Sequence, residues 1–195
     1  MSENIESPTQ PTSSELNLSI FHRGFDRFYP LIRYYYERIR GHAWFSQITT
    51  KLWLGGAPDF PRDYQFLLDH GISAVVNIRA EREDDIHFYH EHQIEYISYK
   101  IPDVATPDPD TIDQAVQWMQ HEIAAGRTVL VHCAKGRGRS ATLAAAYLMA
   151  DEGLTLEQAV KMLEEKRRLT KIETRHRQVL NSWSEKSTGV RFVDR

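Results

Sequence analysis

The sequence predicts an α/β protein with a mainly parallel central sheet and helices on both faces. Short apolar, β-rich segments alternate with segments of helical periodicity along most of the chain. This alternation favours a parallel sheet, because each parallel connection needs a crossover, usually a helix. The 195 residues, 41% of them hydrophobic, suffice for one compact domain with some terminal excess.

The individual elements follow from apolar periodicity and from the residues that start and stop helices. Strands are expected at residues 51–54, 72–78, 94–101 and 128–132, and helices at 59–70, 83–92, from 110 or 111 to 125, at 140–150 and at 174–186. A capping box formed by Thr155 and Gln158 opens one more helix. The 140–150 helix is apolar on nearly every side, so we expect it to be central.

The ends of the chain differ from its middle. Residues 1–19 contain no Lys or Arg and little to bury, which predicts a disordered tail. Residues 20–43 are expected to form a helical extension with a break near Pro30, since aromatic residues recur there at helical spacing among arginines. The extension either packs its apolar face on a core or makes a peripheral membrane contact through residues 20–44. Residues 188–195 are expected to be a C-terminal tail.

Composition excludes several classes of protein. A single cysteine forms neither an internal disulfide nor a thiolate zinc site, and no other metal or cofactor is expected. A net charge of −3 argues against a nucleic-acid partner. No apolar run reaches about 18 residues and no targeting signal is recognised, so we expect a cytoplasmic protein without a membrane span. Histidines such as His87 and His176 are expected at the surface or as caps.

The segment from Val131 to Ser140, Val-His-Cys-Ala-Lys-Gly-Arg-Gly-Arg-Ser, joins a buried strand to a helix. Gly136 and Gly138 permit backbone conformations in which successive N–H groups turn inward, and the helix after them aims its unpaired N–H groups at the same place. Such a loop is expected to bind a tetrahedral dianion, as helix N-termini do for phosphate.

Cys133 lies at the start of this loop. The N–H groups, the helix end and Arg139 are expected to lower the pKa of its thiol below the ordinary value of about 8.5. The thiolate can then attack phosphorus and form a thiophosphoryl enzyme that water later hydrolyses. The Arg139 fork can hold two oxygens of the transferred group, and Ser140 can donate to the sulfur and make it a better leaving group.

The pattern His-Cys-x5-Arg-Ser after a Val-rich strand resembles the signature of the cysteine-dependent protein tyrosine and dual-specificity phosphatases. The resemblance implies that residues 44–187 form a phosphatase catalytic domain in which Cys133 is the nucleophile, Arg139 binds phosphate and His132 supports the loop from behind. The residues expected around the phosphate are Ala134, Lys135, Gly136, Arg137, Gly138 and Arg139.

A phosphatase of this kind also needs a general acid for the leaving alkoxide. The family supplies an Asp from a loop about thirty residues before the nucleophile, and Asp103 lies 30 residues before Cys133. Asp108 and Asp110 lie in the same loop and are alternatives, although they are more typical of a helix start. Asp84 and its neighbour Asp85 are expected to be a solvated helix start.

Over residues 44–183 the chain resembles the phosphatidylglycerophosphate phosphatase branch of the family. The resemblance rests on Trp53-Leu-Gly-Gly, on the strand that leads into Asn77, on Glu81 and Glu83 of an acidic segment, and on the Ser-Ala-Thr helix. Ala80 and Arg82 depart from that acidic segment, and Glu173-Thr174-Arg175 replaces the branch's Arg-Pro loop.

The cations of the loop bear on the substrate. Lys135 and Arg137 favour an anionic phospholipid phosphate, such as phosphatidylglycerophosphate or a phosphoinositide. The alternative is a dual-specificity protein phosphatase that acts on phosphotyrosine and phosphoserine or phosphothreonine. A second alternative is a non-catalytic phosphate-binding scaffold of the same fold, although such a relative usually lacks the Cys or the Arg.

Overall fold

The computed structural model describes residue 31 and residues 33–191, with side chains as far as residue 186. The predicted tail at 1–19 and the predicted break near Pro30 lie outside these residues. The chain divides after Gly41 into two units, which are described separately. In the first, a short π-helix, η1 (Tyr35–Ile39), leaves both of its terminal residues exposed. Membrane contact through residues 20–44 stays a prediction.

The second unit is built on a five-stranded sheet with the strand order β1-β2-β5-β3-β4. Its strands are β1 (Phe45–Gln47), β2 (Leu52–Gly55), β3 (Ile72–Asn77), β4 (Glu95–Ser98) and β5 (Thr128–His132). Every neighbouring pair is parallel except β1 with β2. The mainly parallel sheet is therefore confirmed, but β1 was not expected from the sequence, because three residues are too few to show an alternating pattern.

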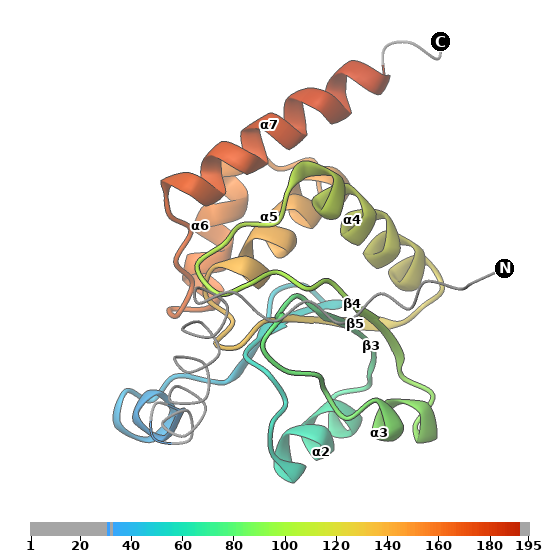
Figure 1. The fold of residues 1–195 in the computed structure, drawn as a ribbon, viewed down its shortest axis with the longest axis vertical. Helices are drawn as coiled ribbons and strands as arrows, with labels where there is room; N and C mark the ends of the chain where they lie inside the picture. Colours follow the sequence, from blue (N-terminus) through green and yellow to red (C-terminus); the bar gives the residue numbers. More distant parts are fainter. Residues whose placement is uncertain (1–30, 32, 192–195) are drawn as a thin grey trace, which may run out of the picture. The chain divides into compact units, whose positions relative to one another are not determined.

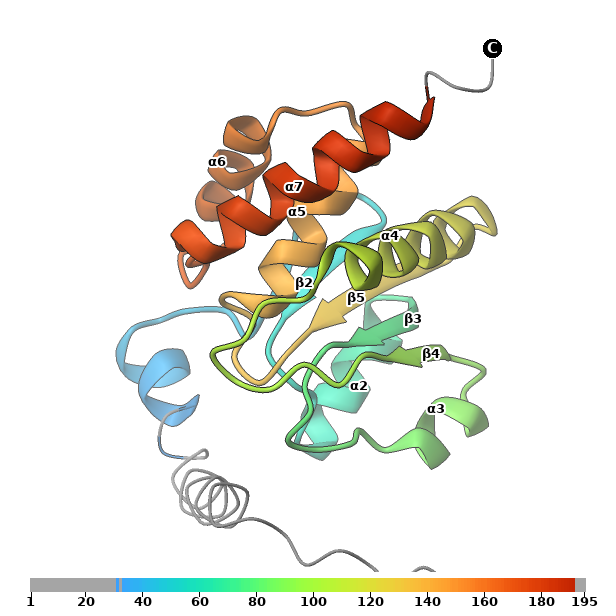
Figure 2. The same cartoon turned by 45° about the horizontal axis from the view of Figure 1, so that its top comes forward.

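Helices cover both faces of the sheet, as expected (Figures 1 and 2). On one face lie α2 (Pro61–Asp69) and α3 (Ile86–Glu91), and on the other lie α4 (Pro109–Ala124), α5 (Arg139–Asp151), α6 (Leu156–Lys166) and α7 (Thr174–Arg191). The Thr155 capping box is confirmed. Two expected starts were wrong: α4 is capped by Asp108 and α3 by Asp85, whose side chains accept from backbone N–H groups three residues on. Helix α7 also continues into the predicted C-terminal tail.

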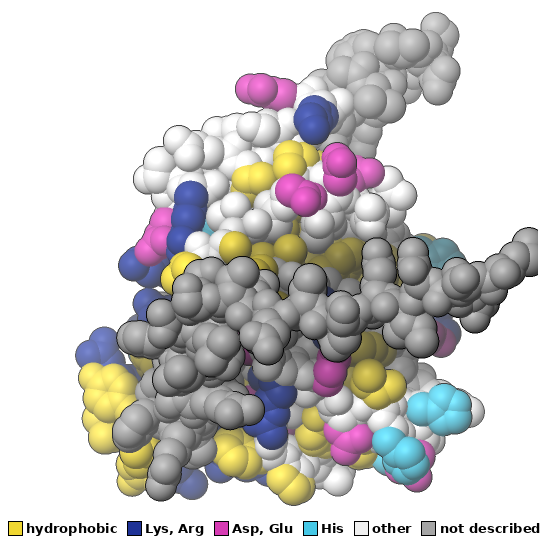
Figure 3. All heavy atoms as spheres, viewed as in Figure 1, with side chains coloured by type: hydrophobic (Ala, Val, Ile, Leu, Met, Phe, Trp, Pro, Cys, Tyr) yellow, Lys and Arg dark blue, Asp and Glu magenta, His cyan; other side chains and the backbone are white. Residues whose placement is uncertain are grey.

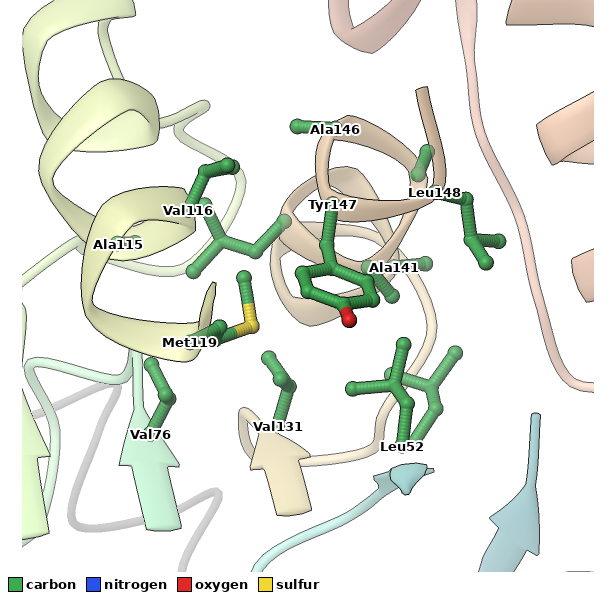
Figure 4. Close-up of a cluster of buried hydrophobic side chains, with 14 of the residues drawn as sticks. Leu52, Val76, Ala115, Val116, Met119, Val131, Ala141, Ala146, Tyr147 and Leu148 are labelled. Carbon is green, nitrogen blue, oxygen red and sulfur yellow. The ribbon is translucent and has the colours of Figure 1, made fainter. Parts of the chain in front are cut away.

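The main core lies between the sheet and the α4–α7 layer. Figure 4 shows Leu52, Val76 and Val131 pointing from three neighbouring strands toward Met119 of α4 and Tyr147 of α5. Alternate strand residues point to this face, as the pleat of a strand requires. Helix α5 is buried along most of its length, which confirms its predicted central position and holds the start of the helix rigidly against β5.

The described residues bear on the predicted lack of a membrane span and on the predicted surface position of the histidines. No helix in the described part of the chain is long and apolar enough to cross a membrane. Exposed histidines gather over α3, where Figure 3 shows them in cyan at the lower right. His87 is 82% exposed and lies 3.5 Å from Glu91, so its expected surface position is confirmed.

Candidate active site

The parallel strands end in one row at one edge of the sheet. Gly55 of β2 pairs with His132 of β5, His132 pairs with Asn77 of β3, and Asn77 pairs with Ser98 of β4. The segments that follow these strands therefore leave the sheet side by side. This edge is where open α/β sheets bind their ligands. Residues far apart in the sequence meet there for this reason.

The loop between β5 and α5, residues 133–138, curls around the sulfur of Cys133 and is called the phosphate loop after its predicted role. The backbone N–H of Gly136 and the hydroxyl of Ser140 both donate to Sγ, each at 3.3 Å. Gly136 has a φ of +65°, and an added Cβ would lie 2.3 Å from the backbone of Gly55. The expected need for glycine is confirmed at this position. Gly138 has a negative φ of −111° and therefore does not use this freedom.

The Cys133 thiol is buried, and its surroundings stabilise the thiolate. Burial alone raises the pKa of Cys133, but the charge of Arg139 and hydrogen bonds from Ser140 and the Arg137 backbone outweigh burial and lower the pKa to about 7. The expected lowering is therefore confirmed in direction. The lowered pKa favours the thiolate, which is the nucleophilic form of cysteine.

Arg139, the first residue of α5, is held between two acidic side chains. Its Nη1 donates to both carboxylate oxygens of Glu81 at 2.8 and 3.0 Å and to the carbonyl of Ile101 at 2.6 Å. Its Nη2 donates to Asp103 at 3.1 Å. The Arg139 side chain is 5% exposed, whereas Asp103 is 51% exposed and lies at the cavity. The structure thus brings together the three residues expected to attack phosphorus, bind phosphate and protonate the leaving group.

Asp84 is not a solvated helix start, and that expectation was wrong. Both Asp84 and His132 have fully buried side chains, and His132 Nε2 lies 2.7 Å from a carboxylate oxygen of Asp84. A carboxylate only accepts, so this contact places a proton on Nε2 of His132. Burial raises the pKa of Asp84, but His132 and Arg79 outweigh it and lower the pKa below its ordinary value. Asp84 therefore holds the His132 ring at the end of β5, directly before the loop begins, while Asp85 caps α3.

Arg167, which the sequence analysis missed, supports the loop from the other side. Its guanidinium donates to the carbonyl oxygens of Gly136 at 2.9 Å, Lys135 at 3.0 Å and Ala43 at 3.0 Å, and its side chain is 2% exposed. No local signal marks this residue, because its partners lie 31 to 124 positions away along the chain.

Replacing Arg167 by lysine is expected to lower the free energy of unfolding by about 2 kcal/mol. The single ammonium group of lysine cannot donate to all of the carbonyl groups that the planar guanidinium reaches. Activity is expected to fall as well, since two of the carbonyls belong to the phosphate loop. Urea denaturation measures the first effect. The exposed neighbour Arg168 supplies the control: Arg168→Lys is expected to change stability by less than about 0.5 kcal/mol. Equal midpoints for the two variants would contradict this role.

A cavity of about 190 Å³ opens above Cys133. It is lined by Asp103, Val104, Ala105, Cys133, Ala134, Lys135, Arg137, Gly138, Arg139, Lys171, Glu173, Arg175 and His176. Six of these residues, from Cys133 to Arg139, belong to the loop after β5 and the start of α5. Four more, from Lys171 to His176, form a wall that the sequence did not predict. His176 is buried rather than on the surface, although its ring does accept from the backbone N–H of Glu173, as a cap would. No group of three or more His, Cys, Asp or Glu side chains in the described residues is arranged to hold a metal.

The groups around Cys133 can transfer a phosphoryl group to a cysteine, which is the reaction of a cysteine-dependent phosphoric monoester hydrolase. They are the thiolate with its lowered pKa, the N–H groups and Arg139 that surround it, and the carboxyl group of Asp103. Comparison with known proteins supports this class and narrows it. Residues 52–186 match the family described as dual specificity phosphatase, catalytic domain. The chain therefore belongs to the dual-specificity phosphatase family and is a cysteine-dependent phosphatase.

The curated relatives include phosphatidylglycerophosphate phosphatases and dual specificity protein phosphatases. The Arabidopsis thaliana phosphatidylglycerophosphate phosphatase PTPMT1 is 29% identical over 138 residues, which are 68% of this chain but only 41% of that protein. The Mus musculus phosphatidylglycerophosphatase and protein-tyrosine phosphatase 1 is 27% identical over 83% of this chain and 90% of its own length. The crystal structure of PTPMT1 in complex with PI(5)P superimposes with a TM-score of 0.69 at 23% identity, over 75% of this chain and 98% of that one. This structural likeness confirms the fold.

Proposed function

We propose that the protein hydrolyses the phosphomonoester of an anionic phospholipid, such as phosphatidylglycerophosphate or a phosphoinositide, through a thiophosphoryl-cysteine intermediate. The observation that carries the proposal is the Cys133 sulfur, which accepts hydrogen bonds from Gly136 and Ser140 and has a pKa of about 7 at the base of a cavity lined by lysine and arginine. A phosphoryl group bound in the loop would bring its phosphorus next to this nucleophile.

In the first step the Cys133 thiolate attacks phosphorus, and the bond from phosphorus to the ester oxygen breaks. Arg139 and the loop N–H groups hold the phosphoryl oxygens, whose negative charge they match. Asp103 gives its proton to the departing alkoxide, so the alcohol leaves neutral. Because Asp103 pairs with Arg139 in the free protein, a bound phosphate that engages Arg139 would free the carboxyl group to turn toward the leaving oxygen.

In the second step water attacks the phosphorus of the thiophosphoryl enzyme. Asp103, now a carboxylate, accepts a proton from this water, which is the reverse of its first role. The bond from sulfur to phosphorus breaks and inorganic phosphate forms. The sulfur leaves as a thiolate, which the hydrogen bond from Ser140 stabilises. The cycle needs no group beyond the chain and water.

The proposal of a lipid substrate rests on the charge of the cavity and on the names of the protein's relatives. Lysine and arginine line it from the phosphate loop and from the wall before α7, and no Phe, Tyr or Trp is among the lining residues of the described chain. Such a site suits a headgroup with several anionic oxygens better than a flat phosphotyrosine ring. Burial and the charges of Arg137 and Arg139 lower the pKa of Lys135, as expected for cations crowded around an anion site. The Arabidopsis relative is named a phosphatidylglycerophosphate phosphatase, and the name of the mouse relative includes phosphatidylglycerophosphatase.

A dual-specificity protein phosphatase is the second candidate. It is favoured by the matched family itself and by the name of the mouse relative, which includes protein-tyrosine phosphatase. The same chemistry at Cys133 would serve a phosphopeptide. The two candidate functions therefore differ only in the groups that bind the rest of the substrate, beyond its phosphate.

A substrate panel tests the proposal. We expect phosphate release from phosphatidylglycerophosphate or a phosphoinositide in mixed micelles to exceed release from phosphotyrosine and phosphothreonine peptides by at least about tenfold in kcat/KM, a difference of about 1.4 kcal/mol in transition-state binding. Cys133→Ser serves as the blank for each substrate. Hydrolysis confined to phosphopeptides would contradict the lipid assignment and favour the second candidate.

A further inference from the structure

The mechanism uses only part of the cavity. The opposite wall, from Lys171 to His176, leads into the first turn of α7, and the backbone N–H of Lys171 donates to the carbonyl of Arg137 in the phosphate loop at 2.9 Å. In Figure 2 this segment descends from α7 toward the β5–α5 loop. The wall is thus fixed to the phosphate loop, yet none of its side chains has a role in the steps above.

His176 is the most informative residue of this wall. It is 2% exposed, and its Nδ1 accepts a hydrogen bond from the backbone N–H of Glu173 at 3.0 Å. An accepting Nδ1 carries no proton, so the neutral ring carries its proton on Nε2. Burial, together with the nearby charge of Arg175, lowers the pKa of His176 and keeps the ring neutral. The ring therefore presents a fixed N–H donor.

This donor lies over the phosphate loop without a partner. A Cβ added to Gly138 would lie 3.0 Å from Nε2, so the edge of the ring lies close against the loop. Both His176 and Gly138 line the cavity. In the described part of the chain Nε2 has no hydrogen-bond acceptor. Nε2 is not one of the fully enclosed polar atoms that lack a partner, so it opens into the cavity, where a water or a ligand oxygen can accept its hydrogen bond.

The charges beside His176 define the kind of ligand. Lys171 Nζ lies 2.7 Å from one carboxylate oxygen of Glu173, and Arg175 Nη2 lies 2.9 Å from the other. The three side chains together carry one net positive charge. Arg175 also donates to the carbonyl of Val104 in the loop that bears Asp103. The charges of Arg175 and Lys171 both act on the His176 ring, so an anionic oxygen bound at Nε2 would be attracted by both cations, at the cost of competing with Glu173 for them.

We propose that His176, assisted by Lys171 and Arg175, binds a second anionic group of the substrate next to the phosphoryl group that is cleaved. The inference rests on the proposed function and refines it: the preferred substrate carries a phosphomonoester together with a second phosphate. That second phosphate is a phosphodiester in a lipid such as phosphatidylglycerophosphate and another monoester in an inositol bisphosphate lipid. The experiment separates these sources.

The test measures KM and kcat of His176→Asn with short-chain phosphatidylglycerophosphate, a short-chain phosphatidylinositol bisphosphate and p-nitrophenyl phosphate. Asparagine keeps an acceptor for the Glu173 N–H but is too short to place a donor where Nε2 lies. For whichever two-phosphate substrate uses the wall, we expect KM to rise about tenfold, the effect of losing one charge-assisted hydrogen bond. The kcat for that substrate, and both constants for p-nitrophenyl phosphate, are expected to stay within about twofold.

Two further variants complete the design. His176→Gln offers a donor at nearly the reach of Nε2 and is expected to recover most of the affinity. His87→Ala removes a histidine that is 82% exposed on α3 and is expected to change nothing. Equal losses with all three substrates, or no change with any, would overturn the inference. So would a wild-type protein that prefers p-nitrophenyl phosphate to both lipids. Failure of the wild type to hydrolyse any of the three would instead refute the proposed function.

Discussion

Cys133→Ser is expected to reduce turnover by about 10⁵-fold or more while leaving phosphate binding intact, because the nucleophile is lost but the cradle is not. The serine hydroxyl has a far higher pKa than the Cys133 thiol, whose pKa is about 7, so almost none of it is ionised at neutral pH. The backbone N–H of Gly136 and the guanidinium of Arg139 remain in place to hold the oxyanion. Steady-state kinetics measures the first effect, and calorimetric titration with inorganic phosphate or vanadate measures the second.

The single cysteine of the chain gives this prediction an internal control. A thiol-specific alkylating reagent modifies only Cys133, so the pH dependence of wild-type inactivation reports the pKa of this thiol directly. We expect inactivation to rise as pH increases through about 7 and bound phosphate to protect against it. Turnover by Cys133→Ser at the wild-type rate would refute covalent catalysis by this residue.

Asp103→Asn is expected to lower kcat by about 10²–10⁴-fold with substrates whose leaving group is an alkoxide, since the amide has no proton to give. The loss is expected to be much smaller with p-nitrophenyl phosphate, because p-nitrophenolate departs without protonation. KM is not expected to rise, because the variant also removes the ion pair at 3.1 Å through which Asp103 competes with phosphate for Arg139. A comparison of kcat across leaving groups of different pKa measures the effect.

Two neighbouring residues serve as matched controls for this variant. Asp108 accepts from the backbone N–H of Thr111 at 2.7 Å and caps α4, so Asp108→Asn is expected to retain activity. Asp110, in the first turn of the same helix, is expected to behave in the same way. A small effect at Asp103 with a large one at Asp108 or Asp110 would transfer the role of general acid to that residue.

The residues that the sequence located correctly belong to contiguous segments. Periodicity located most of the strands and helices, and the spacing between Cys133 and Ser140 predicted a loop that wraps an anion and precedes a helix. The structure confirms that geometry in the hydrogen bonds to the sulfur at 3.3 Å. Asp103 was chosen by its distance from Cys133 along the chain, and the structure places its carboxylate 3.1 Å from Arg139. Its role as general acid stays a prediction.

The residues that the sequence misjudged or missed all act across long stretches of chain. Asp84 carries the signature of a helix start, but it lies 48 residues before His132, and only the parallel register of β3 with β5 brings the two together. Arg167 shows no pattern that separates it from Arg168. No local pattern separates His176 from the other histidines, and only the fold places the start of α7 against the phosphate loop.

The sequence by itself determined the fold class, the candidate nucleophile and its loop, because apolar periodicity and a seven-residue turn with two glycines act through short-range backbone geometry. Tertiary structure alone decided what supports that loop and what walls the cavity above it. A buried carboxylate, guanidinium or imidazole is specified by partners that the folded sheet and helices bring together, and no local pattern records which partners those are.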